Sequence, residues 1–389
     1  MTEAMIVSAV RTPIATAYKG TLRDTPAETL ASHVVSESVR RSGLHADCFD
    51  DVILAESLYG GGDLARYAAV ASGMTTVSGQ AVNRHCAGSL AAVGNAAATI
   101  KADMDLAVIA GGAQSTSLSP TLGWKAIGSD WTVERLPPTF PHTPEANDDV
   151  SLIVGWSTAQ RYDVSREEMD AWALRSHHRA IAAIDADVFA DEIVPLKVTQ
   201  PDGSVHDFAV DEHPRRDSSM ERLSRLKPLH PEIEGFSITA GNSSGLNDAA
   251  AAVALVSDEL ARSESLDPLA RVRSWAAVGV DPRYCGQGAI DSIRKVLSRA
   301  HLSVSDVHLW EINEAFASVP VAACRELDID DAYVNAFGSG CSLGHPIAAS
   351  GARMLATLTF ALRRRGGGIG VAAMCAGGGQ GGAVVIEVS

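Results

Sequence analysis

Four short segments of the sequence carry side chains suited to nucleophilic and acid–base chemistry. Cys86, in VNRHCAGS, stands just before an Ala-rich run that predicts a helix over 88–101. A thiol at a helix N-terminus feels the positive end of the helix dipole, which lowers its pKa and favours the nucleophilic thiolate. A free cysteine is also a common small core residue, and for Cys86 taken alone packing is the better interpretation. His345, in SLGHPIAAS, precedes a second predicted helix that opens with a proline, where a capping or packing role also fits.

Two further polar residues stand at the ends of predicted strands. Cys375, in VAAMCAGGGQGG, ends a buried strand over 369–374 and opens a run of glycines whose backbone N–H groups are free to face a ligand. Asn313, in EINEAF, follows a predicted strand over 307–310, at the carboxyl end where α/β proteins gather functional groups. An N-cap role explains a lone asparagine better. The joint occurrence of two cysteines, a histidine and an asparagine in such places favours catalysis.

The elements that would position these residues repeat once along the chain. Short β-branched runs alternate with Ala-rich helical runs, which is typical of α/β architecture. Both halves consist of a strand, a turn with a reactive residue, a helix, a second strand and glycines. The predicted strands and helix are 80–83, 88–101 and 106–110 in the first half, and 333–335, 347–365 and 369–374 in the second. This order predicts two related α/β halves, an internal duplication.

A segment of different composition separates the two halves. Prolines and charged residues are frequent from 119 to 235, and Ser165 with Glu168 forms the capping box of a helix predicted over 165–183. We interpret this segment as an insertion that covers a pocket at the carboxyl ends of the strands. The predicted divisions are 1–118 for the first part of the N-terminal half, 119–235 for the inserted loop domain, 236–265 for the completion of the N-terminal half and 266–389 for the C-terminal half.

Composition and charge limit the class of protein. The 389 residues are 46% hydrophobic and 20% charged, which excludes wholesale disorder, and the net charge of −15 gives no general attraction to nucleic acid or an anionic membrane. The six cysteines lack CxxC spacing, HExxH is absent and the N-terminus does not resemble a signal peptide. We therefore expect a cytoplasmic protein without membrane insertion and without a metal site. His177 and His178, on the inserted helix, fit a solvated face.

Together these segments resemble the thiolase family. VNRHCAGS, EINEAFAS, VNAFGSGCSLGHPIAASGARM and CAGGGQGG occur in the family's order and approximate spacing, and SITAGNSSGLNDAAAAVAL is similar to its coenzyme-A-loop region. The similarity runs from RTPIA near the N-terminus to the C-terminus. It implies an α/β, thiolase-like fold, with two similar βαβαβαββ halves that form a layered α-β-α-β-α core and an inserted loop domain.

The resemblance implies a role for each candidate residue. Cys86 would be the nucleophile that takes the acyl group from a thioester, and His345 the base that activates it. Cys375 would be the second acid/base, acting on the α-carbon in condensation or on the incoming thiol in cleavage. Asn313, a bound water and His345 would form one oxyanion hole, and the backbone N–H groups of Cys86 and Gly377 would form the other.

The resemblance also implies the substrates. Acyl-CoA and coenzyme A would exchange in a ping-pong reaction, either Claisen condensation of acetyl-CoA or thiolytic cleavage of a 3-oxoacyl-CoA, with no permanently bound cofactor. Ser244 would contact the pantetheine, beside Ala240 and Ser243, and Arg215 would lie near the adenine. An acidic chain needs a local basic patch for this polyanion, and the Arg-rich segment 213–227 is the predicted place. The family also implies a homodimer or a homotetramer.

Some segments depart from the family pattern, and other functions compete. The nucleophile motif has the order Cys-Ala-Gly-Ser, Cys341 replaces an aliphatic residue, and the changed segment 149–156 falls where the family meets the acyl and pantetheine groups. These changes leave the choice of acyl group open. A catalytically altered thiolase-like protein that binds acyl-CoA without turnover is one alternative.

A serine hydrolase is the other alternative. The segment 241–245, GNSSG, matches the G-x-S-x-G signature after a strand-like run over 236–240, with His345 as a possible base. This interpretation leaves both motif cysteines and Asn313 without roles. A dinucleotide site at 368–373, GIGVAA, fails because its glycines precede a strand instead of following one.

Overall fold

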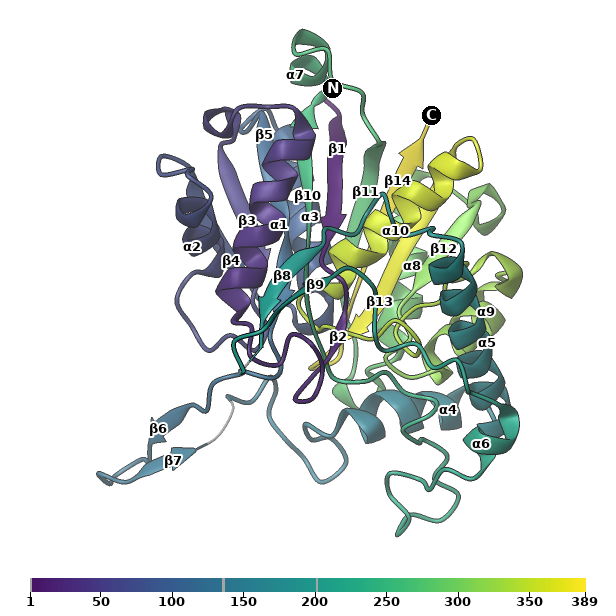
Figure 1. The fold of residues 1–389 in the computed structure, drawn as a ribbon. Helices are drawn as coiled ribbons and strands as arrows, with labels where there is room; N and C mark the ends of the chain where they lie inside the picture. The colour runs from purple at the N-terminus through teal and green to yellow at the C-terminus, as the bar shows by residue number, and fades with distance from the viewer. Residues whose placement is uncertain (1, 135–136, 201) are drawn as a thin grey trace.

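One mixed sheet forms the centre of the computed structural model (Figure 1), which describes residues 2–134, 137–200 and 202–389, so that 135–136 and 201 of the predicted insertion lie outside the described residues. Its strands follow the order β12-β13-β14-β11-β1-β10-β5-β3-β4, and β2 pairs with β10. The strands are β1 (Ala4–Arg11), β2 (Ala15–Thr16), β3 (Asp51–Ala55), β4 (Ser78–Val82), β5 (Ala107–Gln114), β10 (Asn247–Ser257), β11 (Ala270–Gly279), β12 (Leu309–Ile312), β13 (Gly368–Ala376) and β14 (Gln380–Val388).

The strand order shows the predicted duplication directly. In the N-terminal half β1, β10 and β5 are antiparallel neighbours and β3 is parallel to β5, while in the C-terminal half β11, β14 and β13 are antiparallel neighbours and β12 is parallel to β13. The halves join where β1 pairs with β11 over Ala4–Ile6. The N-terminal half therefore presents the carboxyl ends of three parallel strands, β4, β3 and β5, and the C-terminal half those of two, β12 and β13.

The strand predicted over 333–335, the counterpart of β4, is wrong. Only Val334 pairs with Trp310, in an isolated parallel bridge, and the preceding residues form a 3-10 turn, Asp331–Tyr333. Asn335 adopts a left-handed conformation (φ 53°), and its side chain accepts from the N–H of Ile312 at 2.8 Å and donates to the Ile312 carbonyl at 2.8 Å. A side-chain amide thus takes the place that a strand backbone would have filled.

Helices cover the sheet in the predicted α-β-α-β-α layers. The helices are α1 (Ala27–Ser42), α2 (Leu64–Ala71), α3 (Gly88–Lys101), α7 (Asp258–Ser263), α8 (Gln287–Ala300), α9 (Ser318–Leu327) and α10 (Ser350–Arg364). Three buried apolar clusters separate the layers: α1 and α2 pack on the N-terminal half, α3 and α10 lie between the halves, and α8 and α9 pack on the C-terminal half. The predicted helix 347–365 starts later because Pro346 is in a turn, where its carbonyl accepts from Ala349 N at 2.9 Å.

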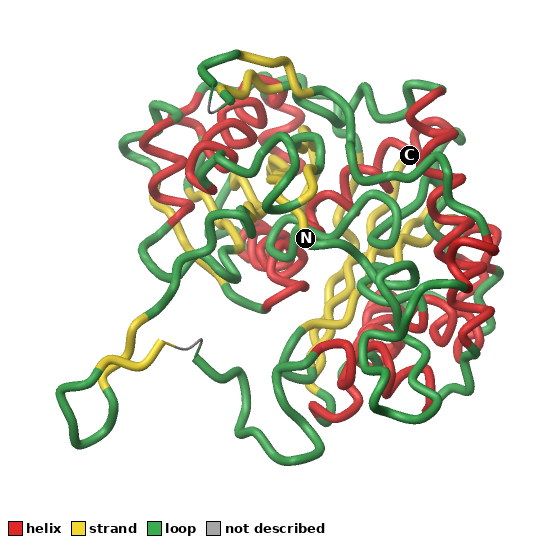
Figure 2. Tube along the Cα trace, turned by 60° about the horizontal axis from the view of Figure 1, so that its bottom comes forward, coloured by secondary structure: helices red, strands yellow, loops and turns green. Residues whose placement is uncertain are grey.

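The segment 119–235 runs over one end of this core. A hairpin of β6 (Gly123–Lys125) and β7 (Thr132–Glu134) projects from the body (Figure 2). The remaining elements are the π-helical turn η3 (Ser151–Trp156), α4 (Ser157–Arg161), α5 (Arg166–Asp185), β8 (Leu196–Thr199), β9 (Val205–Phe208) and α6 (Met220–Ser224). The predicted capping box is confirmed, because the N–H of Ser165 donates to Glu168 at 2.8 Å and the Ser165 hydroxyl accepts from the N–H of Glu168.

A buried ionic network ties this segment to the core. Arg11, at the end of β1, donates to Glu192 at 2.7 Å and to both carboxylate oxygens of Asp211 at 2.7 and 2.9 Å. Thr357 of α10 donates to Glu192 at 3.0 Å. Removing one partner of a buried pair leaves an uncompensated charge, so the inserted segment and the sheet depend on each other. Across the described residues, no helix is long and apolar enough to cross a bilayer.

Candidate active site

The thiol of Cys86 lies at the start of α3, in the 3-10 turn η2 (His85–Ala87). Burial raises the pKa of the Cys86 thiol to about 12, the nearby Cys285 thiol raises it further, and the backbone N–H of Gly377 acts in the opposite direction. The expectation that the helix N-terminus lowers this pKa is wrong, because desolvation outweighs the favourable dipole. The thiol is protonated at neutral pH and needs a base to react.

Two more thiols face Cys86. Cys375 lies near the end of β13, just before the glycine run, and is buried. Burial and the nearby thiols of Cys285 and Cys86 raise its pKa well above the usual value. The thiol of Cys285 donates a hydrogen bond to the carbonyl oxygen of Ala376, with a distance of 2.9 Å from Sγ to that oxygen. Cys285 was not predicted as a site residue, because it belongs to no recognised motif and reaches the site only through packing. The structure therefore brings Cys86, Cys375 and Gly377 together, as predicted, with a third thiol beside them.

His345 is buried, and the side chains of Ser350 and Asn313 contact its ring. Its Nδ1 lies 2.6 Å from the hydroxyl of Ser350, at the start of α10, and the amide nitrogen of Asn313 lies 3.3 Å from the same Nδ1. Burial, with the charge of Arg353, lowers the pKa of His345 to about 3. The imidazole is neutral at pH 7 and is available as a proton acceptor. Ser350 was not predicted as a site residue, because the helix was expected to begin at 347, directly after Pro346, and not at Ser350.

Asn313 lies at the end of β12, where its N–H donates to the carbonyl of Ala373 at 3.0 Å. The N-cap interpretation is wrong, since the next helix, α9, begins only at Ser318. The side-chain oxygen of Asn313 is buried and has no hydrogen-bond partner among the residues that the structure describes. A buried amide oxygen in this state is suited to accept from a bound water or ligand.

Close packing of small residues brings the segments together. The N–H of Ala352 in α10 donates to the Ser89 hydroxyl in α3 at 3.0 Å, so the starts of the two central helices are adjacent. A Cβ on Gly112 would lie 2.1 Å from the carbonyl oxygen of Ala348, so only glycine allows this approach. Within the described part of the chain no hydrogen bond joins Cys86 to His345; they lie on neighbouring segments.

Glu314, the residue after Asn313, connects the inserted segment to the site. Its carboxylate accepts from the Trp172 indole at 2.9 Å, the Ser176 hydroxyl at 2.6 Å, the Asn335 amide at 2.7 Å and the N–H of Cys341 at 3.1 Å. Two of these donors lie on α5 and two on the loop that leads to His345. The two glutamates of EINEAF could have indicated this role, but the partners of Glu314 come from distant segments.

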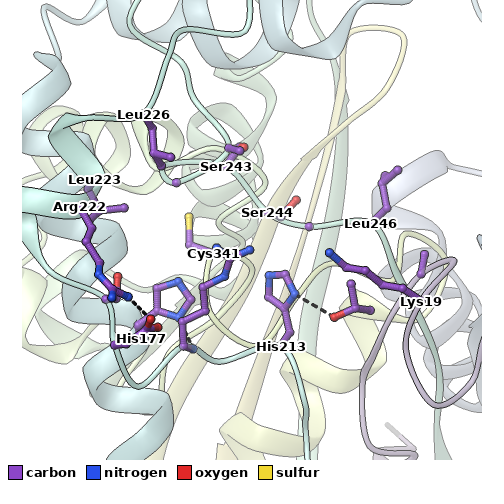
Figure 3. Close-up of a pocket in the computed structure, with 18 of the residues that line it drawn as sticks. Lys19, His177, His213, Arg222, Leu223, Leu226, Ser243, Ser244, Leu246 and Cys341 are labelled. Atoms are coloured by element: carbon purple, nitrogen blue, oxygen red, sulfur yellow. Dashed lines mark hydrogen bonds and ion pairs between the residues drawn. The ribbon is translucent and has the colours of Figure 1, made fainter.

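A cavity of about 830 Å³ lies beside this centre (Figure 3). All four predicted coenzyme A residues line it, namely Arg215, Ala240, Ser243 and Ser244. Leu246, also in the wall, pairs with His345 through an isolated bridge, and the N–H of Ser244 donates to the Ala315 carbonyl at 2.9 Å, so the cavity adjoins the catalytic candidates.

The cavity carries the predicted basic patch. Arg215 and Arg222 line it, and Lys19, from the loop after β2, adds a cation that sequence reasoning missed (Figure 3). Arg222 pairs with Asp217 at its edge. Lys19 was missed because it lies nearly two hundred residues from the Arg-rich segment and meets it only in the folded chain.

The solvated-face interpretation of His177 is wrong, although His178 is exposed. His177 is buried in the cavity wall, where its Nδ1 accepts from the N–H of Arg215 at 3.1 Å. The ring thus fixes the backbone that carries a predicted coenzyme A residue. Among the described residues, no group of three or more His, Cys, Asp or Glu side chains is arranged to hold a metal ion.

The serine-hydrolase arrangement is not formed. Residues 236–240 contain no strand beyond a single bridge from Thr239 to Pro228. The Ser243 hydroxyl is buried and donates to the carbonyl of Thr239 at 2.7 Å. A nucleophilic serine instead donates its proton to a neighbouring base, and among the described residues no hydrogen bond joins Ser243 to His345.

Buried histidines should make the protein less stable as the pH falls. Burial, with neighbouring cations, lowers the pKa of His177 and His213 to about 4 and that of His345 to about 3. Between pH 6.5 and 5 the unfolded chain binds these protons and the folded chain does not. Glu311 opposes them, because burial raises its pKa to about 7 and the folded state keeps its proton. The net difference of about two protons predicts a loss of about 2 to 3 kcal/mol per pH unit.

Urea unfolding at pH 7 and pH 5.5 measures this loss. His177→Gln should reduce the pH dependence by about one proton, whereas His178→Gln, on the exposed side of α5, should leave it unchanged. Equal unfolding free energies at both pH values would show that the histidines titrate normally.

Similarity to known proteins agrees with this geometry. The chain is 38% identical to the 3-oxoadipyl-CoA/3-oxo-5,6-dehydrosuberyl-CoA thiolase of Escherichia coli, with 100% of both chains covered. It is 39% identical to the beta-ketothiolase BktB of Cupriavidus necator, with 99% of both covered. The crystal structure of the Bacillus anthracis acetyl-CoA acetyltransferase superposes with a TM-score of 0.90 at 36% identity, covering 100% of this chain and 99% of that one. Models of the thiolase N-terminal and C-terminal domains match residues 4–259 and 266–388, and the chain therefore belongs to the thiolase family.

Proposed function

We propose that this acyltransferase carries its acyl group on Cys86. The observation that supports the proposal best is the meeting of the Cys86 and Cys375 thiols beside the backbone N–H of Gly377. Cys86 gives its proton to His345 and attacks the thioester carbonyl. The bond from the carbonyl carbon to the sulfur of coenzyme A then breaks, and the coenzyme A sulfur leaves with the proton of Cys375, which becomes a thiolate. The product of this half-reaction is an acyl-enzyme.

The second half-reaction uses Cys375. In condensation, Cys375 takes a proton from the α-carbon of acetyl-CoA, the carbanion attacks the acyl carbonyl, and the bond to the Cys86 sulfur breaks as the carbon–carbon bond forms. In cleavage, the same steps run backwards on a 3-oxoacyl-CoA. His345, which carries the proton taken from Cys86, and the Asn313 amide would hold the enolate oxygen, and the N–H groups of Cys86 and Gly377 would hold the oxyanion of the acyl carbonyl. His345 returns its proton as the Cys86 sulfur leaves.

The cavity is the proposed coenzyme A site. Its lining supplies Lys19, Arg215 and Arg222 to a polyanion on a chain whose net charge is −15. Ser244 and Ser243 form the wall nearest to the catalytic segments, which suits the pantetheine arm. Coenzyme A enters and leaves as substrate and product, and the proposal includes no permanently bound cofactor.

The segment 149–156 is the proposed determinant of acyl preference. The N–H of Cys285 donates to the carbonyl of Ile153 at 3.0 Å, which places this segment against the thiols. Trp156 packs on Phe236, with ring centroids 5.2 Å apart. Relatives named for 3-oxoadipyl-CoA and for acetyl-CoA are 38% and 37% identical to this chain, so similarity does not favour one acyl group. The proposed substrates are therefore 3-oxoacyl-CoA thioesters and acetyl-CoA as classes.

The domain division, assembly and compartment follow as further parts of the proposal. We propose an inserted loop domain over 119–235 that covers the substrate site, since α5 and the cavity wall at Arg215 both come from it. A homodimer or homotetramer follows from family resemblance. A cytoplasmic location is supported by the free state of all six cysteines, because the chemistry requires reduced thiols.

Thiolysis of a series of 3-oxoacyl-CoAs, from acetoacetyl-CoA to 3-oxoadipyl-CoA, tests the function. We expect cleavage of at least one of them and a mass increase of one acyl group on the peptide that contains Cys86. In the same assay Arg215→Gln should raise the KM for coenzyme A about 10-fold and leave the KM for N-acetylcysteamine, which has no phosphates, unchanged. Arg225→Gln is the matched control, because Arg225 pairs with Glu221 outside the cavity lining. Coenzyme A binding without any acylation would instead support the non-catalytic alternative.

A further inference from the structure

His85, the residue directly before Cys86, has an unusual backbone conformation. Its φ is +45°, in the left-handed region that few non-glycine residues occupy. Side chains hold it there: the N–H of His85 donates to the Asn83 side-chain oxygen at 2.9 Å, and its carbonyl accepts from the Ser57 hydroxyl at 2.9 Å. Such conformations persist where surrounding contacts impose them, and they cluster at functional sites.

The imidazole of His85 lies between the glycine turn and the inserted segment. A Cβ on Gly377 would meet the Cγ atom of His85 at 3.2 Å and its Nδ1 at 3.4 Å, so the ring lies directly beside this glycine. On its other edge the Nε2 lies 3.0 Å from the hydroxyl of Thr139. The methyl group of Thr139 packs on Gly378, where a Cβ would meet it at 2.2 Å. His85 and Thr139 therefore cover two successive glycines from the outside.

The turn of these glycines closes the hairpin of β13 and β14, where Ala376 pairs with Gln380, and the Gly379 carbonyl accepts from the N–H of Val280 at 2.7 Å. Gly378 has φ +76°, a conformation that favours glycine, so this position of the turn carries no side chain. The Gln380 amide donates to the Gly377 carbonyl at 3.0 Å from within the same turn. The N–H of Gly377 is the group that acts on the Cys86 thiol, so the direction of that N–H depends on whatever holds the turn.

We propose that His85 is a positioning residue, which together with Thr139 clamps the turn of Gly377 so that its N–H points at the acyl oxygen on Cys86. The inference rests on the proposed function of Cys86 and Gly377. It gives the inserted segment a direct part in acylation, in addition to covering the substrate site.

The clamp should act on the rate of acylation and not on the binding of coenzyme A. Neither His85 nor Thr139 lines the cavity that holds Lys19 and Arg215. An oxyanion donor contributes only when it is aimed at the oxygen that becomes charged. Burial lowers the pKa of His85, with Asp148 acting in the opposite direction, so the ring is neutral at pH 7 and the Thr139 contact is a hydrogen bond between neutral groups.

Single-turnover acylation of the full chain by acetoacetyl-CoA tests the clamp, with the acyl-enzyme measured by mass spectrometry. Thr139→Val keeps the shape but removes the hydroxyl, and we expect acylation to slow about 5- to 10-fold, with the KM for coenzyme A unchanged. Thr139→Ser, which keeps the hydroxyl, should retain most of the rate. His85→Leu should slow acylation at least as much, and the His85→Leu, Thr139→Val double variant should be no slower than His85→Leu alone, since both act through one contact. Thr143→Val, in the same segment, is the control.

The outcomes separate the two hypotheses. If the unmodified protein is not acylated at Cys86, the proposed function fails. If it is acylated and Thr139→Val reacts at the same rate, the clamp alone is refuted. An equal rise of KM and loss of rate in Thr139→Val would indicate general loosening and would also refute it. Should His85→Leu fail to fold, the Thr139→Val and Thr139→Ser pair still decides the matter.

Discussion

Cys86→Ala is expected to reduce thiolysis about 10,000-fold, to the rate left by binding and polarisation alone. The variant keeps the cavity, His345 and the donor N–H groups, but it has no atom to carry the acyl group. The loss should appear both in steady-state cleavage of a 3-oxoacyl-CoA and in the disappearance of the acyl-enzyme. Because Cys86 does not line the coenzyme A cavity, the variant should bind coenzyme A as well as the unmodified protein does.

Cys48→Ala is the matched control, because Cys48 is an exposed free cysteine in the turn Ala46–Cys48. It should retain full activity. Residual activity of Cys86→Ala above a few per cent would contradict the role of Cys86 and would direct attention to Cys285 or Cys375, the two thiols beside it.

His345→Ala is expected to lower the acylation rate about 1,000-fold at pH 7, within the range for general bases. The physical reason is the pKa of about 12 at Cys86. Without a neighbouring base only the small thiolate fraction reacts, and that fraction grows about tenfold per pH unit. The variant should therefore recover activity steeply as the pH rises. The unmodified protein should not, because its base, with a pKa of about 3, is already neutral.

Acylation rates from pH 6 to pH 10 measure this difference. Ser350→Ala should lose about 10-fold, since it removes only the hydrogen bond that orients the ring. His178→Ala, an exposed histidine on α5, should show no change. A parallel pH profile in His345→Ala and the unmodified protein would mean that another group takes the proton of Cys86.

Local sequence patterns predicted the elements where one segment decides its own structure. The helix Gly88–Lys101 was predicted with both of its ends correct, and Ser165 with Glu168 forms the predicted capping box. Alanine-rich periodicity and a three-residue capping spacing act within single turns. The repeated order of strand, reactive residue and helix likewise predicted the duplicated sheet, because each half repeats the same local pattern.

Features that depend on distant segments were not predictable from one sequence. Asn335 replaces a strand because its amide reaches Ile312, and Cys285 joins the thiols because β11 lies beside β14. The pKa of the Cys86 thiol is raised mainly by desolvation, which depends on the surrounding fold and cannot be read from a sequence motif. His85 stood in a recognised motif, but its partner Thr139 comes from the inserted segment.

The position of β1 has a consequence for synthesis of the chain. This first strand lies between β10 and β11, which begin at Asn247 and Ala270. At about 5–20 residues per second, roughly 10 to 50 s pass on the ribosome before a neighbour emerges. During that time the apolar segment Ala4–Arg11 has neither neighbouring strand to pair with. For much of it the guanidinium of Arg11 also lacks the carboxylates of Glu192 and Asp211. Strand β1, made before both of its neighbours, is therefore enclosed only after they have been made.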